Sequence, residues 1–298
     1  MVIDRDKTLI FSDSFKDLYA FEEIINLQTA LYENDIKFLD LSRISFIEPY
    51  SMLGLLLVGR NYLRSTGERL CLLDIPVNIH QYLARMDFFE KGIFSLRHEL
   101  DEKYFLKRSS LSKRLIEITD IPNKERESVK VISDIVFLFR KRAGHILKYW
   151  FSNTIVDYFV TVISEICQNV FEHSLDSGYL AIQTYSVGKE HIVRFVISDS
   201  GIGIRRSFEG VADIHFESNA KLIERVLTTP ISSKRAFGYG LCQVNAIVDR
   251  LRGSIYIRSE DASVAIMYNR KYSGGAYSFL KNDLVAFPGT QISISLSA

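Results

Sequence analysis

Short apolar, strand-like runs alternate with helix-length amphipathic segments through the first hundred residues of the chain. Strands are predicted at 37–41, 44–47 and 69–73, and helices at 14–33, 49–64 and 77–89. Pro49 suits the first turn of a helix, and Gly67 marks the point where that helix stops. This alternation indicates layers of helices on a sheet, which is an α/β fold rather than an all-β or all-α one.

Residues 101–114 are polar and charged and lack helical apolar periodicity, so they are predicted to be a linker. A chain of 298 residues is long enough for two domains, which we place at 1–105 and 106–298. In the second domain, helices are predicted at 124–142, 151–174 and 240–251, and strands at 115–121, 179–185, 191–198, 254–259, 263–268 and 291–296.

Composition excludes several classes of protein. The formal net charge is +1, which argues against non-specific nucleic-acid binding; the one local basic cluster (Lys103, Lys107, Arg108, Lys113, Arg114) fits a solvated linker. The charged N-terminus is not a secretory signal, and no apolar run is long enough to span a membrane. Three isolated cysteines without metal-ligand spacing indicate reduced thiols, so a cytoplasmic location is expected.

The segment 151–174 combines an apolar stripe with a polar face. The stripe consists of Phe159, Ile163, Ile166 and Val170, while Thr161, Glu165, Asn169 and His173 recur every four residues. Glu165 and Asn169 should therefore lie one turn apart on the same face. Simple exposure to water would produce the same pattern, so motifs later in the chain must decide between the two.

Two glycine-containing motifs lie beyond this helix. Asp199-Ser-Gly-Ile-Gly203 comes directly after a predicted strand, and Gly238-Tyr-Gly240-Leu241 opens a predicted helix. A carboxylate beside backbone without side chains can accept a hydrogen bond from an exocyclic amine while a flat ring approaches the main chain. Free amides at a helix start favour phosphate. Together with the Glu/Asn helix, these motifs predict a nucleotide site with a metal.

These residues resemble the GHKL ATPases, a family that includes histidine kinases, gyrase-type ATPases, Hsp90 and the anti-sigma-factor serine kinases. Glu165–Asn169 is similar to the N box, Asp199–Gly203 to the G1 box and Gly238–Leu241 to the G2 box, and Gly289-Thr290 to the terminal Gly-Thr element. The resemblance covers about residues 110–298. It implies a Bergerat-type α/β sandwich, a mixed sheet with helices on one face.

The resemblance also implies roles for individual residues. Asn169 would coordinate Mg²⁺, Asp199 would recognise the adenine of ATP, and Thr290 would lie near Asp199. The glycines around base and phosphates would be Gly201, Gly203, Gly238 and Gly240, with Leu241 completing the last motif. His173 fits the anti-sigma-kinase form of the N box, or simply caps or packs the helix end.

Glu165 matches the glutamate thought to act as general base in the ATP-hydrolysing and serine-kinase branches. Histidine kinases usually have no such base, and His145 is a poor match to their phosphoacceptor, so that branch is disfavoured. The stretch 204–237 would be the lid over the phosphates. Within it Lys234 or Arg235 could reach the γ-phosphate, although a solvated loop with two surface charges accounts for the same residues.

The amino-terminal segment DLSRISFIEPYSMLGLLLVGR resembles the STAS fold of anti-sigma-factor antagonists, over about residues 1–98. The family presents a phosphorylatable serine after an acidic residue, whereas this chain has Glu48-Pro49-Tyr50 there. Ser51 is the nearest hydroxyl, shifted by one or two positions. The resemblance therefore implies a docking surface that has lost its acceptor, or a clamp on its own ATPase domain.

The sequence supports two hypotheses for function. In the first, the protein is an ATP- and Mg²⁺-dependent serine/threonine kinase or slow ATPase of the anti-sigma-factor type, which acts by partner switching. In the second, bound ATP changes affinity for a protein partner with little or no turnover. Both involve a protein partner, such as a STAS-type regulator, and neither involves a membrane. A homodimer is expected from the habits of both resembled families.

Overall fold

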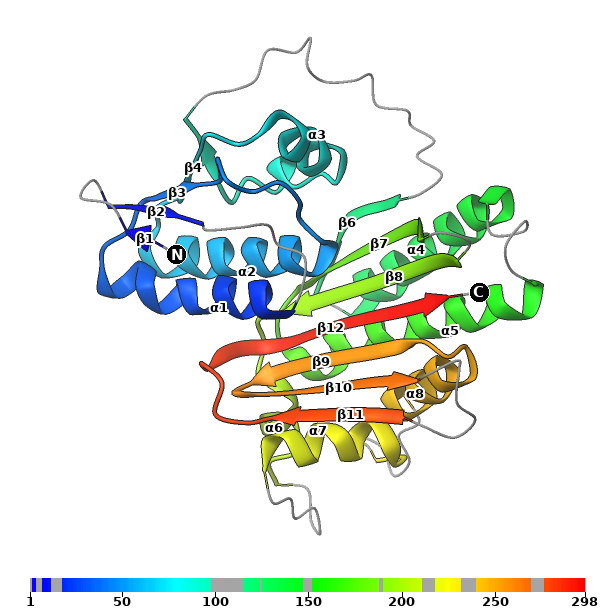
Figure 1. The fold of residues 1–298 in the computed structure, drawn as a ribbon. Coiled ribbons are helices and arrows are strands. Elements are labelled where there is room, and N and C mark those ends of the chain that lie inside the picture. Colours follow the sequence, from blue (N-terminus) through cyan, green and yellow to red (C-terminus); the bar gives the residue numbers. More distant parts are fainter. Residues whose placement is uncertain are drawn as a thin grey trace. The chain divides into compact units, whose positions relative to one another are not determined.

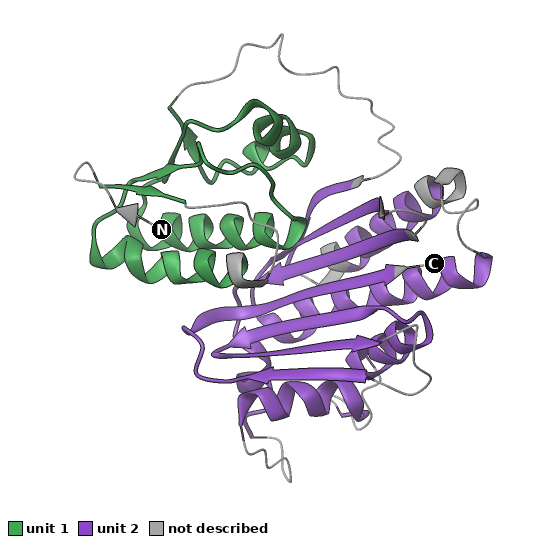
Figure 2. Cartoon of the chain, viewed as in Figure 1, with its two compact units in different colours: residues 1–112 green, residues 113–298 purple. Residues whose placement is uncertain are grey.

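A computed structural model of the chain describes residues 2–3, 7–11, 18–97, 115–123, 125–146, 152–187, 190–210, 218–231, 240–268 and 276–297. The chain divides into two compact units, residues 1–112 and 113–298 (Figure 2). Each unit is built from helices and one sheet. The predicted linker at 101–114, with its basic cluster, lies outside the described residues.

Unit 1 has a five-stranded sheet in sequential order (Figure 1). Its strands are β1 (Val2–Ile3), β2 (Thr8–Ile10), β3 (Phe38–Asp40), β4 (Cys71–Leu73) and β5 (Ser95–Leu96). The helices between them are α1 (Leu18–Glu33), α2 (Pro49–Thr66), α3 (Val77–Arg85) and the short 3₁₀ helix η1 (Phe89–Lys91). Strands β2 to β5 pair in parallel and β1 is antiparallel to β2. Parallel pairing follows from the helical crossovers between successive strands.

Helix α2 begins and ends where its punctuating residues predict. Pro49 opens the helix, and Gly67 closes it in the left-handed region at φ 74°, with its N–H donating to the carbonyl of Leu63. Gly54 lets Phe21 of α1 approach closely, because a Cβ there would lie 2.5 Å from that ring. The predicted strand at 44–47 is wrong: the segment is an irregular connection, although Ile44 and Ile47 are buried.

Unit 2 contains a seven-stranded sheet in the order β11-β10-β9-β12-β8-β7-β6. Its strands are β6 (Leu115–Ile121), β7 (Gly178–Val187), β8 (Glu190–Asp199), β9 (Ser254–Glu260), β10 (Ala262–Tyr268), β11 (Ala276–Lys281) and β12 (Phe287–Ser297). Its helices are α4 (Glu125–Ile146), α5 (Asn153–Asn169), α6 (Gly203–Ser207), α7 (Asn219–Thr228) and α8 (Gly240–Arg250), and a π-helical turn, η4 (Val170–Ser174), continues α5.

A mixed sheet, with both parallel and antiparallel neighbouring strands, was expected in this unit. That expectation is wrong for the pairing of the strands. Every neighbouring pair of the described strands is antiparallel. Strands β8 and β9 do run in the same direction, as expected for strands joined through helices. Strand β12 lies between them and is antiparallel to both, so the two parallel strands never touch (Figure 1).

One core joins the sheet of unit 2 to its helices. Alternate residues of β8 (Val193, Phe195, Ile197) share a buried cluster with residues from α4, α5, α7 and α8. The rings of Phe159 and Phe195 lie 5.6 Å apart, and the rings of Phe139 and Phe159 lie 6.2 Å apart. These contacts fix α5 against β8, which sets the position of its polar face.

The segment expected to form a lid, 204–237, is partly a packed helix. Helix α7 starts at the N-cap Ser218 and places Leu222, Ile223 and Leu227 in the core. Its first turn is tied to the loop after β11, because the N–H of Ala220 donates to Asn282 Oδ1 at 3.0 Å. The part of the expected lid over 219–228 is therefore a helix fixed in the core. No helix among the described residues is both long and apolar enough to cross a membrane.

Candidate functional site

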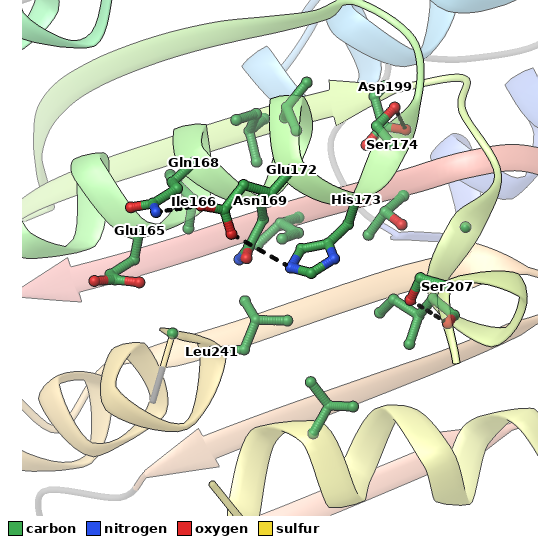
Figure 3. Close-up of a pocket in the computed structure, with 18 of the residues that line it drawn as sticks. Glu165, Ile166, Gln168, Asn169, Glu172, His173, Ser174, Asp199, Ser207 and Leu241 are labelled. Atoms are coloured by element: carbon green, nitrogen blue, oxygen red, sulfur yellow. Dashed lines mark hydrogen bonds and ion pairs between the residues drawn. The ribbon is translucent and has the colours of Figure 1, made fainter. Parts of the chain in front are cut away.

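Helix α5 presents its polar face to a cavity of about 210 Å³ (Figure 3). The buried residues Phe159 and Ile163 of α5 pack into the core, and Ile166 belongs to the core and also lines the cavity. The cavity wall includes eight residues singled out from the sequence: Glu165, Asn169, His173, Asp199, Gly203, Gly240, Leu241 and Thr290. Four motifs widely separated in the chain therefore meet at one place. Gly201 is not part of this wall, and Lys234 and Gly238 lie outside the described residues.

Asp199 ends β8 and is only 5% exposed. Its Oδ1 accepts hydrogen bonds from the Ser174 hydroxyl at 2.7 Å and from the Gly201 N–H at 2.8 Å. Its backbone carbonyl accepts a hydrogen bond from Gln291 Nε2 at 3.1 Å. Buried polar groups need such partners, and these contacts hold the carboxylate in one orientation at the cavity wall.

The two described glycines of the first motif serve close packing. A Cβ on Gly201 would lie 1.8 Å from the carbonyl oxygen of Ser174, so only glycine lets this turn lie against the end of η4. Gly203 has φ 78°, and a Cβ there would lie 2.7 Å from Glu260 Cγ. Gly203 is thus the first residue of α6 and lies beside the β9–β10 turn. The Gly201 N–H donates to the Asp199 carboxylate.

Gly240, the first residue of α8, faces the polar side of α5. A Cβ at this position would lie 3.1 Å from Glu165 Oε2 and 3.7 Å from Asn169 Oδ1. The start of α8, where amides are free to bind anions, is therefore next to a carboxylate and an amide oxygen. A phosphate placed at this helix start would have both side chains beside it.

The position of Asn169 is compatible with the role of Mg²⁺ ligand that the family resemblance implies. Its Nδ2 is buried and has no hydrogen-bond partner among the described residues, so its amide retains unused polar capacity at the cavity wall. The described residues contain no group of three His, Cys, Asp or Glu side chains able to hold a metal. A single amide oxygen suits Mg²⁺, which keeps several waters and takes phosphate oxygens as further ligands.

Thr290 lies in β12, at a bulge between Phe287 and Thr290, rather than before the strand as expected. The oxygen of its hydroxyl is 3.3 Å from that of Ser259, which itself accepts the Ile204 N–H at 2.9 Å. Gly289 has φ 84°, and a Cβ on it would lie 2.2 Å from the Asp199 carbonyl oxygen. Gly289 therefore approaches Asp199 through the backbone, whereas the Thr290 hydroxyl lies beside Ser259.

Several lining residues are not apparent from the sequence. On η4, Glu172 accepts a hydrogen bond from Gln168, and its Oε2 lies 3.8 Å from His173 Nε2 (Figure 3). Apolar residues close the opposite wall: Ile204, Phe208, Val226 and Ile231. The helical spacing of Leu222, Ile223, Val226 and Leu227 could have revealed α7, and hence this wall. Nothing local signals that Ser174 reaches Asp199.

Comparison with known proteins agrees with this geometry. Residues 155–295 match the family model described as histidine kinase-, DNA gyrase B-, and HSP90-like ATPase. No curated protein matches the chain in sequence. The match runs from α5 to β12 and so contains every described residue assigned above to the site. Residues 155–295 are therefore an ATPase domain of the histidine kinase, DNA gyrase B and HSP90 type.

Proposed function

We propose that the protein is an ATP- and Mg²⁺-dependent serine/threonine kinase or slow ATPase of the anti-sigma-factor type, which acts in the cytoplasm by partner switching. The observation that carries the proposal is the position of Glu165. Its carboxylate lies beside both Asn169 and the first residue of α8. A base at this point is next to the place where a terminal phosphate would bind.

In this proposal Asp199 accepts a hydrogen bond from the exocyclic amine of adenine, which selects ATP over GTP. The start of α8, including Gly240 and Leu241, contacts the phosphates, and Asn169 holds Mg²⁺. When bound, the ion neutralises phosphate charge during transfer. Lys234 and Gly238 are assigned to the phosphates on the resemblance alone.

Glu165 then acts as general base. Its carboxylate orients a water or a serine hydroxyl and accepts its proton as the oxygen attacks the terminal phosphate. Ile204, Phe208, Val226 and Ile231 also line the cavity, and their apolar side chains reduce the contact of bulk water with a nucleotide bound there.

A second candidate is a nucleotide-gated interaction module with little or no turnover. The burial of Ser51 favours it: the hydroxyl nearest to the expected phosphoacceptor position of unit 1 is 1% exposed. A STAS-like unit without an accessible acceptor suits a docking role. Both candidates require ATP binding at the same site, and they differ in whether the terminal phosphate is then transferred.

Calorimetry of ATP binding with and without Mg²⁺, followed by phosphate release in the same sample, tests the proposal. Glu165→Gln should keep nucleotide binding and lose about 10²–10⁴-fold in release. Asp199→Ala should abolish measurable ATP binding. Asp134→Asn, which neutralises an exposed carboxylate on α4, is the matched control and should behave as wild type.

The outcomes separate the two candidates. Binding with release that depends on Glu165 supports a catalyst. Binding without release favours the gated module, which pull-downs of protein partners with and without ATP then examine. Unchanged ATP affinity in Asp199→Ala would refute the site assignment, and absence of ATP binding by the wild-type protein would refute both candidates.

A further inference from the structure

We infer that Ser174 is a positioning residue that sets adenine specificity through Asp199. The inference rests on the proposed function, because it takes Asp199 as the group that recognises the base. Ser174 is the last residue of η4, and its hydroxyl donates to Asp199 Oδ1 at 2.7 Å (Figure 3). Both side chains are buried.

The backbone brings the two residues together. Leu175, which follows the π-helical turn η4, has φ 59°, a left-handed conformation that L side chains seldom adopt. The chain then turns sharply, and the carbonyl of Ser174 accepts the Ile202 N–H at 2.9 Å. Such π-helical turns often mark functional positions in helices. Here the turn places Ser174, at the end of the helix, against Asp199 at the end of β8, 25 residues later in the chain.

The hydrogen bond from Ser174 to Asp199 helps to fix the orientation of the carboxylate. Ser174 Oγ and the Gly201 N–H both donate to the same oxygen, Oδ1, which fixes the rotation of the carboxylate about its Cβ–Cγ bond. The oxygen of the Ser174 hydroxyl also accepts the Asp176 N–H at 3.3 Å, so the hydroxyl itself is held on two sides. A methyl group at this position would leave Oδ1 with only the Gly201 donor among these contacts.

Gly201 belongs to the same arrangement. Any side chain there would collide with the carbonyl or hydroxyl of Ser174, at 1.8 Å and 2.1 Å from an added Cβ. The glycine of the Asp-x-Gly turn is thus needed so that Ser174 can reach Asp199. Asp199, Ser174 and Gly201 form a buried unit that directs the carboxylate at the cavity wall, and specificity for the exocyclic amine depends on that direction.

The experiment compares ATP with purine riboside triphosphate, which lacks the exocyclic amine, by titration with wild type, Ser174→Ala and Ser174→Thr. We expect Ser174→Ala to weaken ATP binding about 10- to 150-fold, the loss expected for a buried hydrogen bond to a charged group, with the analogue little affected. Ser174→Thr keeps the hydroxyl and should restore preference for ATP. Ser177→Ala removes a nearby hydroxyl that donates to Asp176, and should leave the preference unchanged.

The ratio of the two affinities distinguishes positioning from mere support of the helix end. A structural role would weaken both nucleotides equally or neither, and either result would overturn the inference. If Asp199→Asn removes the preference for ATP while Ser174→Ala keeps it, the inference fails and the proposed function stands. If wild type binds neither nucleotide, the proposed function itself fails.

Discussion

Gly240 and Glu165 face each other across the cavity so closely that a Cβ on Gly240 would lie 3.1 Å from Glu165 Oε2. A side chain at position 240 would therefore require the Glu165 carboxylate to shift by a few tenths of an ångström. The first residue of α8 and the proposed base of α5 share one small volume. A methyl group on residue 240 would therefore displace the Glu165 carboxylate.

Gly240→Ala should weaken ATP binding about tenfold, because the methyl group displaces the Glu165 carboxylate from the start of α8. The melting temperature of the nucleotide-free protein should not fall, since alanine is the better residue in a helix. Calorimetry measures the affinity. In a Glu165→Ala background the same substitution should cost little more; full additivity of the two changes would contradict direct crowding.

Phe159→Ala should reduce the free energy of unfolding by about 3–5 kcal/mol, because it empties a fully buried position between Phe139 and Phe195. Phe137→Ala is the matched control: this ring lies on α4 and is 67% exposed, so its loss should change stability by about 0.5 kcal/mol or less. Urea denaturation of both variants measures the difference. Equal effects would show that the core does not position α5.

Glu260 provides a prediction for pH. Burial raises the pKa of its carboxyl group, with Arg206 at 3.8 Å opposing the shift, and Oε2 has no hydrogen-bond partner among the described residues. A raised pKa in the folded state means that the folded form is favoured while the group is protonated. That stability is lost as the pH rises through the folded-state pKa.

Glu260→Gln should therefore raise the melting temperature by about 1–3 °C at about pH 7.5, with the difference closing towards about pH 4. Thermal unfolding across this range measures it, with Asp134→Asn as the control for a general change in charge. A destabilised glutamine variant at neutral pH would mean that the ionised carboxylate makes a favourable contact with Arg206 that outweighs its burial.

Thiol reactivity should distinguish the three cysteines. Cys167 is fully buried in α5, and burial raises the pKa of its thiol, so the thiolate needed for alkylation does not form. Cys71 and Cys242 are partly exposed. Iodoacetamide followed by peptide mass analysis should label these two in the native protein, and Cys167 only after denaturation. Rapid labelling of Cys167 in native protein would show that α5 opens readily.

The sequence predicted elements whose pattern is local. Strand β6 has the predicted bounds, and α2 follows its Pro49 and Gly67 signals closely. The polar spacing of Glu165 and Asn169 correctly identified a face of α5 that lines a cavity. Such features depend on neighbours within a few residues, which is the range over which helix and strand periodicity operates.

Elements that depend on distant partners were missed or misread. Strand β11 is mostly exposed and has no alternation of buried and exposed residues; it is a strand because it pairs with β10. In the segment 44–47, Ile44 and Ile47 are buried without regular strand pairing, whereas Phe46 is exposed. The contact between Ser174 and Asp199 results from a π-helical turn and a tight loop, neither of which leaves a periodic pattern.

The central place of β12 has a consequence for the order in which the site can form. This strand pairs with β8 on one side and with β9 on the other, and it is the element that joins the three-stranded half β6–β8 to the three-stranded half β9–β11. Asp199 belongs to the first half, whereas Ser259 belongs to the second. Until residues 287–297 are inserted between them, the halves share no edge, so nucleotide affinity is expected to be among the last properties that the folding chain acquires and among the first that it loses.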